Sequence, residues 1–114
     1  MIDHITRFAA IDWSGAKGSK HPGIALAICD RGRTAPELVM PPARFWSRTA
    51  ILDWLLDHRD KPILVGFDFS FSAPFIERGA HLPGETETRD ANALWKFVNT
   101  ECDDDDLGAA SFLE

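Results

Sequence analysis

Two aspartates each close an apolar stretch of the chain. Asp12 ends residues 6–12, and Asp68 ends a run that begins at Ile63. If both stretches are neighbouring parallel strands, their carboxyl ends meet at one edge of a sheet, about 4.8 Å apart. Carboxylates held that close favour a shared proton or a shared cation. Because oxygen ligands suit Mg²⁺ or Mn²⁺, the sequence predicts Asp12 and Asp68 as ligands of such a metal ion.

The residues that follow each aspartate have two readings. Ser14, Gly15 and Lys17 lie in a glycine-rich turn, which either permits a tight hairpin or cradles a phosphate with backbone N–H groups. Trp13 either packs in the core or stacks on a base beside the metal. Ser70 follows Asp68 as Ser14 follows Asp12. The spacing is not that of a Walker A or a dinucleotide-binding motif.

Hydrophobic periodicity predicts an α/β fold. Strands are expected at residues 6–12, 23–30 and, loosely, 36–45, and they form an antiparallel meander. A helix over residues 47–58 then leads to a strand from residue 63, which is parallel to the first. The second strand is apolar throughout, which predicts that both of its faces are covered. Short helices are expected near residues 73–79, at 90–99 and from 103 to 113, with a loop at 82–88.

Composition narrows the function classes. The chain has 114 residues and a net charge of −6, so its overall field does not attract nucleic acid. No apolar run reaches the roughly 18–20 residues of a membrane span, and no targeting segment is visible, so a cytoplasmic protein is expected. The four histidines have no ligand spacing, and His21 is expected in an exposed turn. One domain over residues 1–114 is the prediction, and the oligomeric state is left open.

The two motifs together resemble a known superfamily. The segments FAAIDWSGAKG, GIALAICD and ILVGFDFSFS are similar to the ribonuclease H-like superfamily, and most similar to its predicted nucleases of domain of unknown function 429. The resemblance implies a mixed sheet with three antiparallel strands, a helix, and a fourth strand parallel to the first. It also implies metal-dependent phosphodiester hydrolysis, with Asp12 and Asp68 as catalytic residues that bind the metal, and with nucleic acid as the partner.

The chain departs from that family after residue 75. The superfamily adds a fifth strand and a helix that bring further acids, whereas here Asp103–Asp106 alone could supply them. The chain is therefore expected to be either the N-terminal portion of a longer domain, cut before the fifth strand, or a relative of the family with a rebuilt site. In both cases we expect little or no nuclease activity.

Two alternatives stay open. The turn IDWSGAKG is also similar to the phosphate-binding turn of actin-like sugar kinases, which would make the partner a nucleotide phosphate. In a non-catalytic binding module, by contrast, the aspartates would only cap loops.

Overall fold

The computed structural model describes residues 2–69 and 90–113. It divides into two compact units, Met1–Asp68 and Phe69–Glu114. None of the helices within the described ranges is long and apolar enough to cross a membrane.

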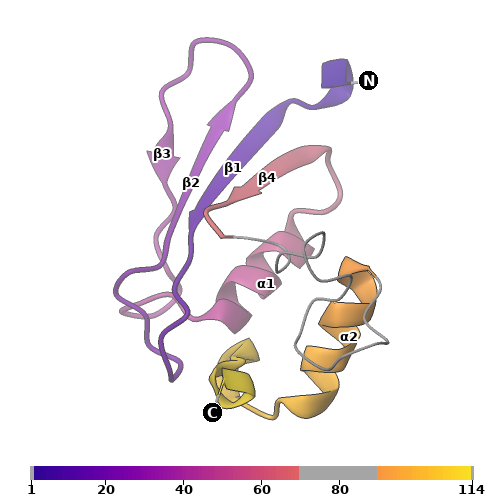
Figure 1. The fold of residues 1–114 in the computed structure, drawn as a ribbon. Coiled ribbons are helices and arrows are strands. Elements are labelled where there is room, and N and C mark those ends of the chain that lie inside the picture. The colour runs from indigo at the N-terminus through magenta and orange to yellow at the C-terminus, as the bar shows by residue number, and fades with distance from the viewer. Residues whose placement is uncertain (1, 70–89, 114) are drawn as a thin grey trace. The chain divides into compact units, whose positions relative to one another are not determined.

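A four-stranded mixed sheet forms the first unit (Figure 1). Its strands are β1 (Arg7–Asp12), β2 (Ala25–Asp30), β3 (Glu37–Leu38) and β4 (Ile63–Phe67), in the order β3-β2-β1-β4. A short 3₁₀ turn (η1, Ile2–His4) precedes them. β2 is antiparallel to both β1 and β3, and β4 is parallel to β1. The predicted meander and the parallel return strand are therefore confirmed, as is the α/β class.

The third strand is much shorter than predicted. Only Glu37–Leu38 pairs as a strand, whereas the expected range was residues 36–45. Pro41 and Pro42 explain the difference, because proline has no N–H to donate to a ladder. After Leu38, the Val39 N–H donates to the Leu26 carbonyl oxygen at 2.8 Å, and the Trp46 backbone forms an isolated bridge with His21.

The first helix has the boundaries that its end residues predict. Helix α1 spans Arg48–Asp57, and the Ser47 side chain caps it by accepting a hydrogen bond from the Ala50 N–H at 3.0 Å. At the other end, His58 stacks on Trp54 with ring centroids 3.9 Å apart. The connection from α1 to β4 contains Pro62, which cannot continue a helix.

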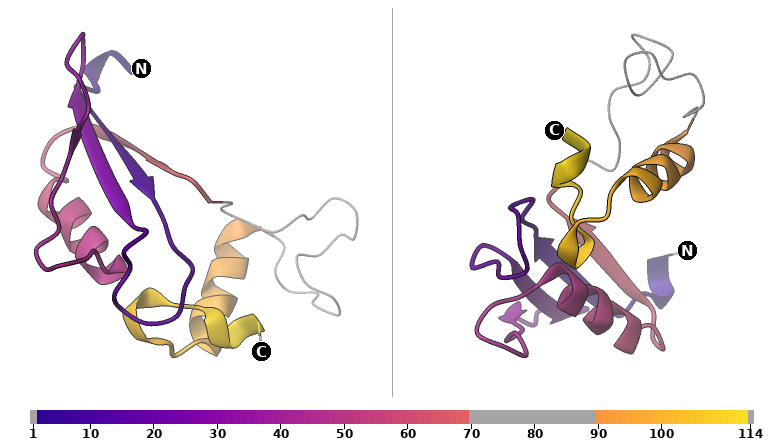
Figure 2. Two further views of the ribbon diagram at one scale, coloured as in Figure 1. Left: turned by 90° about the vertical axis from the view of Figure 1, so that its left-hand side faces the viewer. Right: turned by 90° about the horizontal axis from the view of Figure 1, so that it is seen from below.

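Helix α1 covers one face of the sheet, as the edge-on view in Figure 2 shows. The buried side chains between them include Leu26 at 0% exposure and Ile51 at 1%. In the described part of the first unit, the buried core cluster comprises Ala9, Ile11, Ile24, Leu26, Trp46 and Ile51. Strand β2 was expected to be covered on both faces, and this is wrong for the described part of the first unit. Alternate residues Ala25, Ala27 and Cys29 point away from α1 and are only half-buried.

The second unit is built on helix α2, Ala91–Glu101. Asp90 caps it by accepting a hydrogen bond from the Ala93 N–H at 2.8 Å, so the helix predicted at residues 90–99 is confirmed. Phe97 packs edge-on against Phe112, with ring centroids 5.9 Å apart.

Another α-helix was expected to begin within residues 103–113, and this is wrong. Two 3₁₀ turns stand there instead, η2 (Asp105–Leu107) and η3 (Ala110–Leu113). Asp106 and Leu107 have positive φ values of 54° and 57°, a left-handed conformation that a right-handed helix cannot contain. The expected short helix at 73–79 and the loop at 82–88 lie outside the described residues.

Candidate acidic site at the ends of β1 and β4

The parallel pairing of β1 with β4 brings Asp12 and Asp68 together. Ile11 lies opposite Phe67 in the register, so the next residue on each side is an aspartate. The two carboxyls share a side-chain hydrogen bond. Asp68 Oδ1 also accepts a hydrogen bond from the Trp13 backbone N–H at 2.9 Å. The two predicted ligands therefore form one acidic pair at the sheet edge.

The two carboxyls differ in their affinity for a proton. The hydrogen bond to Asp68 and the repulsion between the two charges raise the pKa of Asp12 above its usual value. The hydrogen bond from the Trp13 N–H, together with the one shared with Asp12, lowers the pKa of Asp68. Of the two carboxyls, Asp12 therefore keeps a proton to higher pH than Asp68. A bound cation would replace that proton.

The turn after Asp12 is exposed and contains an internal hydrogen bond. The Ser14 hydroxyl accepts a hydrogen bond from the Ala16 N–H at 3.2 Å. Gly18 has a φ of +89°, in the left-handed region that favours glycine. Gly15 and Lys17 are exposed. The Ala16 N–H and the Ser14 oxygen, two groups that a phosphate cradle would need, are thus already bonded to each other.

The Arg48 side chain binds this turn through hydrogen bonds, a role that the sequence did not predict. Its side chain is nine-tenths or more buried, since the residue is only 3% exposed. Nη1 donates to the carbonyl oxygens of Ser14 at 2.7 Å and Ala16 at 3.1 Å, and Nη2 donates to Gly18 at 3.3 Å. One signal was available in the sequence. A cation in the first turn of a helix opposes the helix dipole, so a residue there needs another partner.

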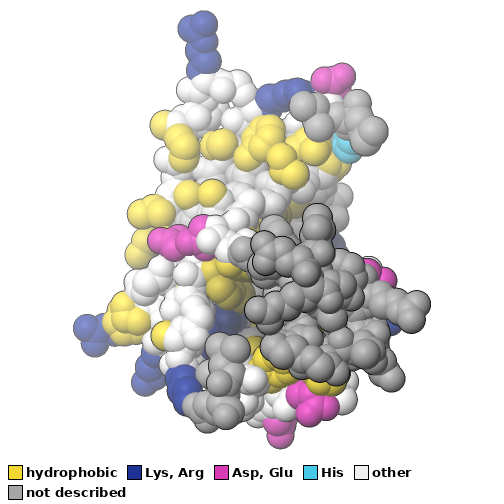
Figure 3. Space-filling model, in the orientation of Figure 1, with side chains coloured by type: hydrophobic (Ala, Val, Ile, Leu, Met, Phe, Trp, Pro, Cys, Tyr) yellow, Lys and Arg dark blue, Asp and Glu magenta, His cyan; other side chains and the backbone are white. Residues whose placement is uncertain are grey.

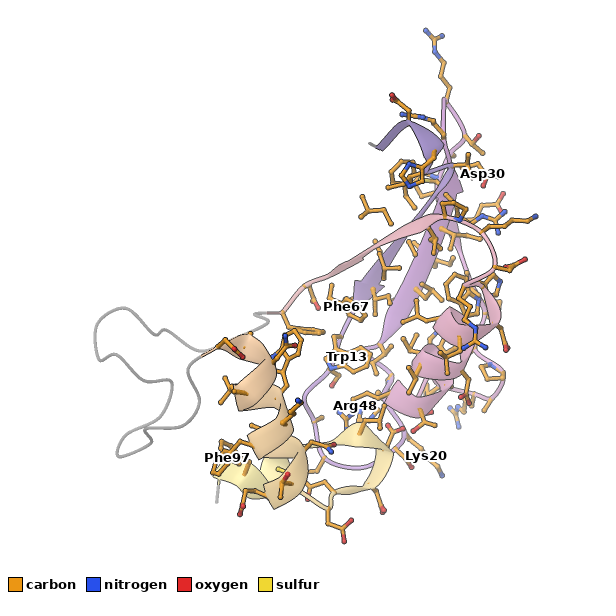
Figure 4. The ribbon with its side chains drawn as sticks, turned by 90° about the vertical axis from the view of Figure 1, so that its right-hand side faces the viewer. Trp13, Lys20, Asp30, Arg48, Phe67 and Phe97 are labelled. Atoms are coloured by element: carbon orange, nitrogen blue, oxygen red, sulfur yellow. The ribbon has the colours of Figure 1, made fainter. Side chains whose placement is uncertain are left out.

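Trp13 contributes its backbone to the site, while its ring belongs to the core. The ring packs edge-on against Phe67, with centroids 5.7 Å apart, and touches the buried cluster. Figure 4 shows Trp13 beside Phe67, with Arg48 near the start of α1. The core reading of this residue is the one that the structure supports.

Among the other residues singled out in the sequence, Asp104 and His21 have contacts within their own units. Ser70 lies outside the described residues. Asp103–Asp106 belong to the second unit, where Asp104 Oδ2 accepts a hydrogen bond from the Ser111 N–H at 2.8 Å. His21 was expected to be exposed, and this is wrong, because it is 2% exposed and its backbone is bonded to Trp46. Within residues 2–69 and 90–113, no group of three or more acidic, histidine or cysteine side chains is placed to hold a metal ion.

The sheet face opposite α1 forms a shallow apolar groove that reaches the acidic pair. Small residues line much of it, and the hydrophobic side chains on this face are visible in Figure 3. The lining comprises Ala10, Ile11, Asp12, Ala25, Ala27, Leu38, Gly66, Phe67 and Asp68. The pair is therefore accessible along this face in the described part of the first unit.

Comparison with known proteins adds no assignment to this geometry. No family model matches the chain, and searches of curated proteins and of solved structures found no match either. The resemblance to ribonuclease H-like nucleases that the sequence motifs suggest therefore stays a prediction.

Proposed function

We propose that this chain carries the metal-binding edge of a ribonuclease H-like, metal-dependent phosphodiesterase. The observation that supports it is the acidic pair itself. Two exposed carboxyls share a hydrogen bond at the carboxyl ends of adjacent parallel strands, the edge at which α/β sheets bind ligands. The proposed partner is a nucleic-acid phosphodiester, and the proposed metal is Mg²⁺ or Mn²⁺.

The donor set fits a hard divalent cation. Asp12 and Asp68 supply only carboxylate oxygens, which Mg²⁺ and Mn²⁺ prefer over zinc. When bound, such an ion would polarise a phosphoryl oxygen and offset the charge that develops on it. The protein's own contribution is to hold two carboxylates at one edge, with the Trp13 N–H keeping Asp68 ionised.

The pair on its own is a partial site. Two-metal hydrolysis needs further carboxylates to hold both ions a few Å apart, and the described residues place no third acid with this pair. A single ion on two monodentate aspartates keeps most of its coordination as water. We therefore expect weak Mn²⁺ binding and little or no nuclease activity from residues 1–114.

A Mn²⁺ titration tests the proposal. Electron paramagnetic resonance measures the free Mn²⁺ during the titration, and the wild-type chain should bind one ion. The double variant Asp12→Asn, Asp68→Asn should abolish that binding. Arg7 and Asp30 form an exposed ion pair at the opposite end of β1, with N···O 3.1 Å. Asp30→Asn is therefore a matched control that removes one carboxylate far along the strand. Equal Mn²⁺ binding by the wild type and the double variant would reject the proposal.

The kinase-like alternative has less support from the turn. The contacts of Ser14, Ala16 and Gly18 turn their backbone toward Arg48 and toward one another. A nucleotide-binding turn should show slower amide exchange over residues 13–22 when ATP and Mg²⁺ are added. Protection there, without Mn²⁺ binding to the acidic pair, would favour this alternative over the nuclease-type site.

A further inference from the structure

Arg48 stands out as a buried charge with a specific set of partners. An arginine that is 3% exposed requires hydrogen-bond acceptors, because an uncompensated buried charge is costly. Three acceptors come from one short stretch, the carbonyl oxygens of Ser14, Ala16 and Gly18. The planar guanidinium can serve several acceptors at fixed angles at once, which a lysine ammonium on a flexible stem cannot do in the same way.

That stretch begins directly after the residue that contacts the acidic pair. Trp13 donates its N–H to Asp68 Oδ1 at 2.9 Å, and the next residue is the first one held by Arg48. The Trp13 ring is fixed against Phe67 on its other side. The position of Trp13 is thus constrained by its ring contact with Phe67 and by the following turn, in which Arg48 binds three carbonyl oxygens. Movement of that turn would move the N–H that orients Asp68.

We propose that Arg48 is a positioning residue of the acidic site: its buried guanidinium fixes the turn of residues 14–18 and thereby holds the Trp13 N–H on Asp68. The anchoring concerns the protein alone. Its consequence for a cation rests on the proposed function, because it assumes that Asp12 and Asp68 bind one. The role parallels that of residues outside the ligand set that orient metal ligands in other proteins.

The first readout follows the anchoring without any metal. In Arg48→Met the Trp13 amide should exchange its hydrogen at least about tenfold faster, while the amides of the β1–β2 ladder change much less. General destabilisation would instead speed both sets by a similar factor. Arg48→Lys keeps the charge and should give an intermediate rate. Where Arg48→Met does not fold, Arg48→Lys against the wild type provides the same comparison.

The second readout is Mn²⁺ affinity. Loss of a residue that orients metal ligands typically lowers affinity by about 10–100-fold, and Arg48→Met should fall in the lower part of that range. Arg44 is a matched control, since it lies four positions earlier, is exposed, and stacks over Phe45 at 5.2 Å. Arg44→Met removes the same charge and should leave Mn²⁺ affinity within about twofold.

The outcomes separate the two proposals. Trp13 exchange that changes in step with the sheet amides would overturn the anchoring role. Trp13 exchange that accelerates alone, with Mn²⁺ affinity equal to that of Arg44→Met, would overturn its consequence for the site. A wild-type chain that binds no Mn²⁺ would refute the proposed function, and the exchange rates would still decide whether Arg48 anchors the turn.

Discussion

The shared proton of Asp12 and Asp68 predicts a specific pH dependence of Mn²⁺ binding. The pKa of Asp12 is raised and that of Asp68 is lowered, so the pair loses its two protons in separate steps. Between the two steps the pair carries one proton and one negative charge. Above the Asp12 step it carries two negative charges and no proton. A cation that binds both carboxylates must displace whatever protons remain.

The size of the effect follows from counting those protons. Above the pKa of Asp12 the dissociation constant should be independent of pH. Between the two steps one proton is released on binding, so the constant should rise about tenfold for each pH unit of acidification. Below the pKa of Asp68 two protons are released, and the rise should approach about a hundredfold per unit.

Folding stability should respond to the two groups in opposite senses. The raised pKa of Asp12 means that its protonated form is favoured in the folded chain, so that contribution is present in acid and is lost as pH rises through the folded value. The lowered pKa of Asp68 contributes stability above the ordinary value of 3.8, and this is lost as pH falls through the folded value. Circular dichroism at each pH therefore has to accompany the binding measurement.

Isothermal titration with Mn²⁺ at a series of pH values measures this dependence. Asp12→Asn removes the titrating proton, so its weaker binding should become flat over the range in which the wild type shows a tenfold slope. A wild-type affinity without any slope on the acid side, measured while the chain remains folded, would refute the reasoning. So would a slope that persists unchanged in Asp12→Asn.

Three further substitutions test the fold that carries the site. Ile51→Ala removes a side chain that lies between α1 and the sheet and is 1% exposed. The substitution should lower the free energy of urea unfolding by about 2–5 kcal/mol. A loss under about 1 kcal/mol would contradict a packed core there. Ser47→Ala deletes the cap of α1 and should cost about 1 kcal/mol, with Ser47→Asp restoring most of it. Gly66→Ala should be neutral or stabilising by up to about 1 kcal/mol, because within residues 2–69 and 90–113 the added Cβ meets only the Ala9 carbonyl oxygen at 4.0 Å. Clear destabilisation would mean that the groove face is filled.

The sequence by itself determined the main elements and the pairing of the two aspartates. Apolar runs that end on Asp12 and Asp68, with a capped amphipathic helix between them, have few compact arrangements. A strand that follows a helical crossover pairs most simply in parallel, and parallel neighbours end at the same edge. The observed register, Ile11 opposite Phe67, agrees with that reasoning.

Only the tertiary structure decided which groups control the pair. The local sequence pattern is compatible with two interpretations of the glycine-rich turn, a tight hairpin and a phosphate cradle, because the spacing of the glycines suits both. A buried arginine more than thirty positions away settles the direction of its carbonyls. His21 is likewise buried where its backbone forms a bridge with Trp46. The sequence does not predict this bridge, because the two residues lie far apart in the chain. Residues far apart in the chain come into contact only when the sheet and α1 pack. Hydrophobic periodicity therefore does not predict these contacts, which depend on the tertiary fold.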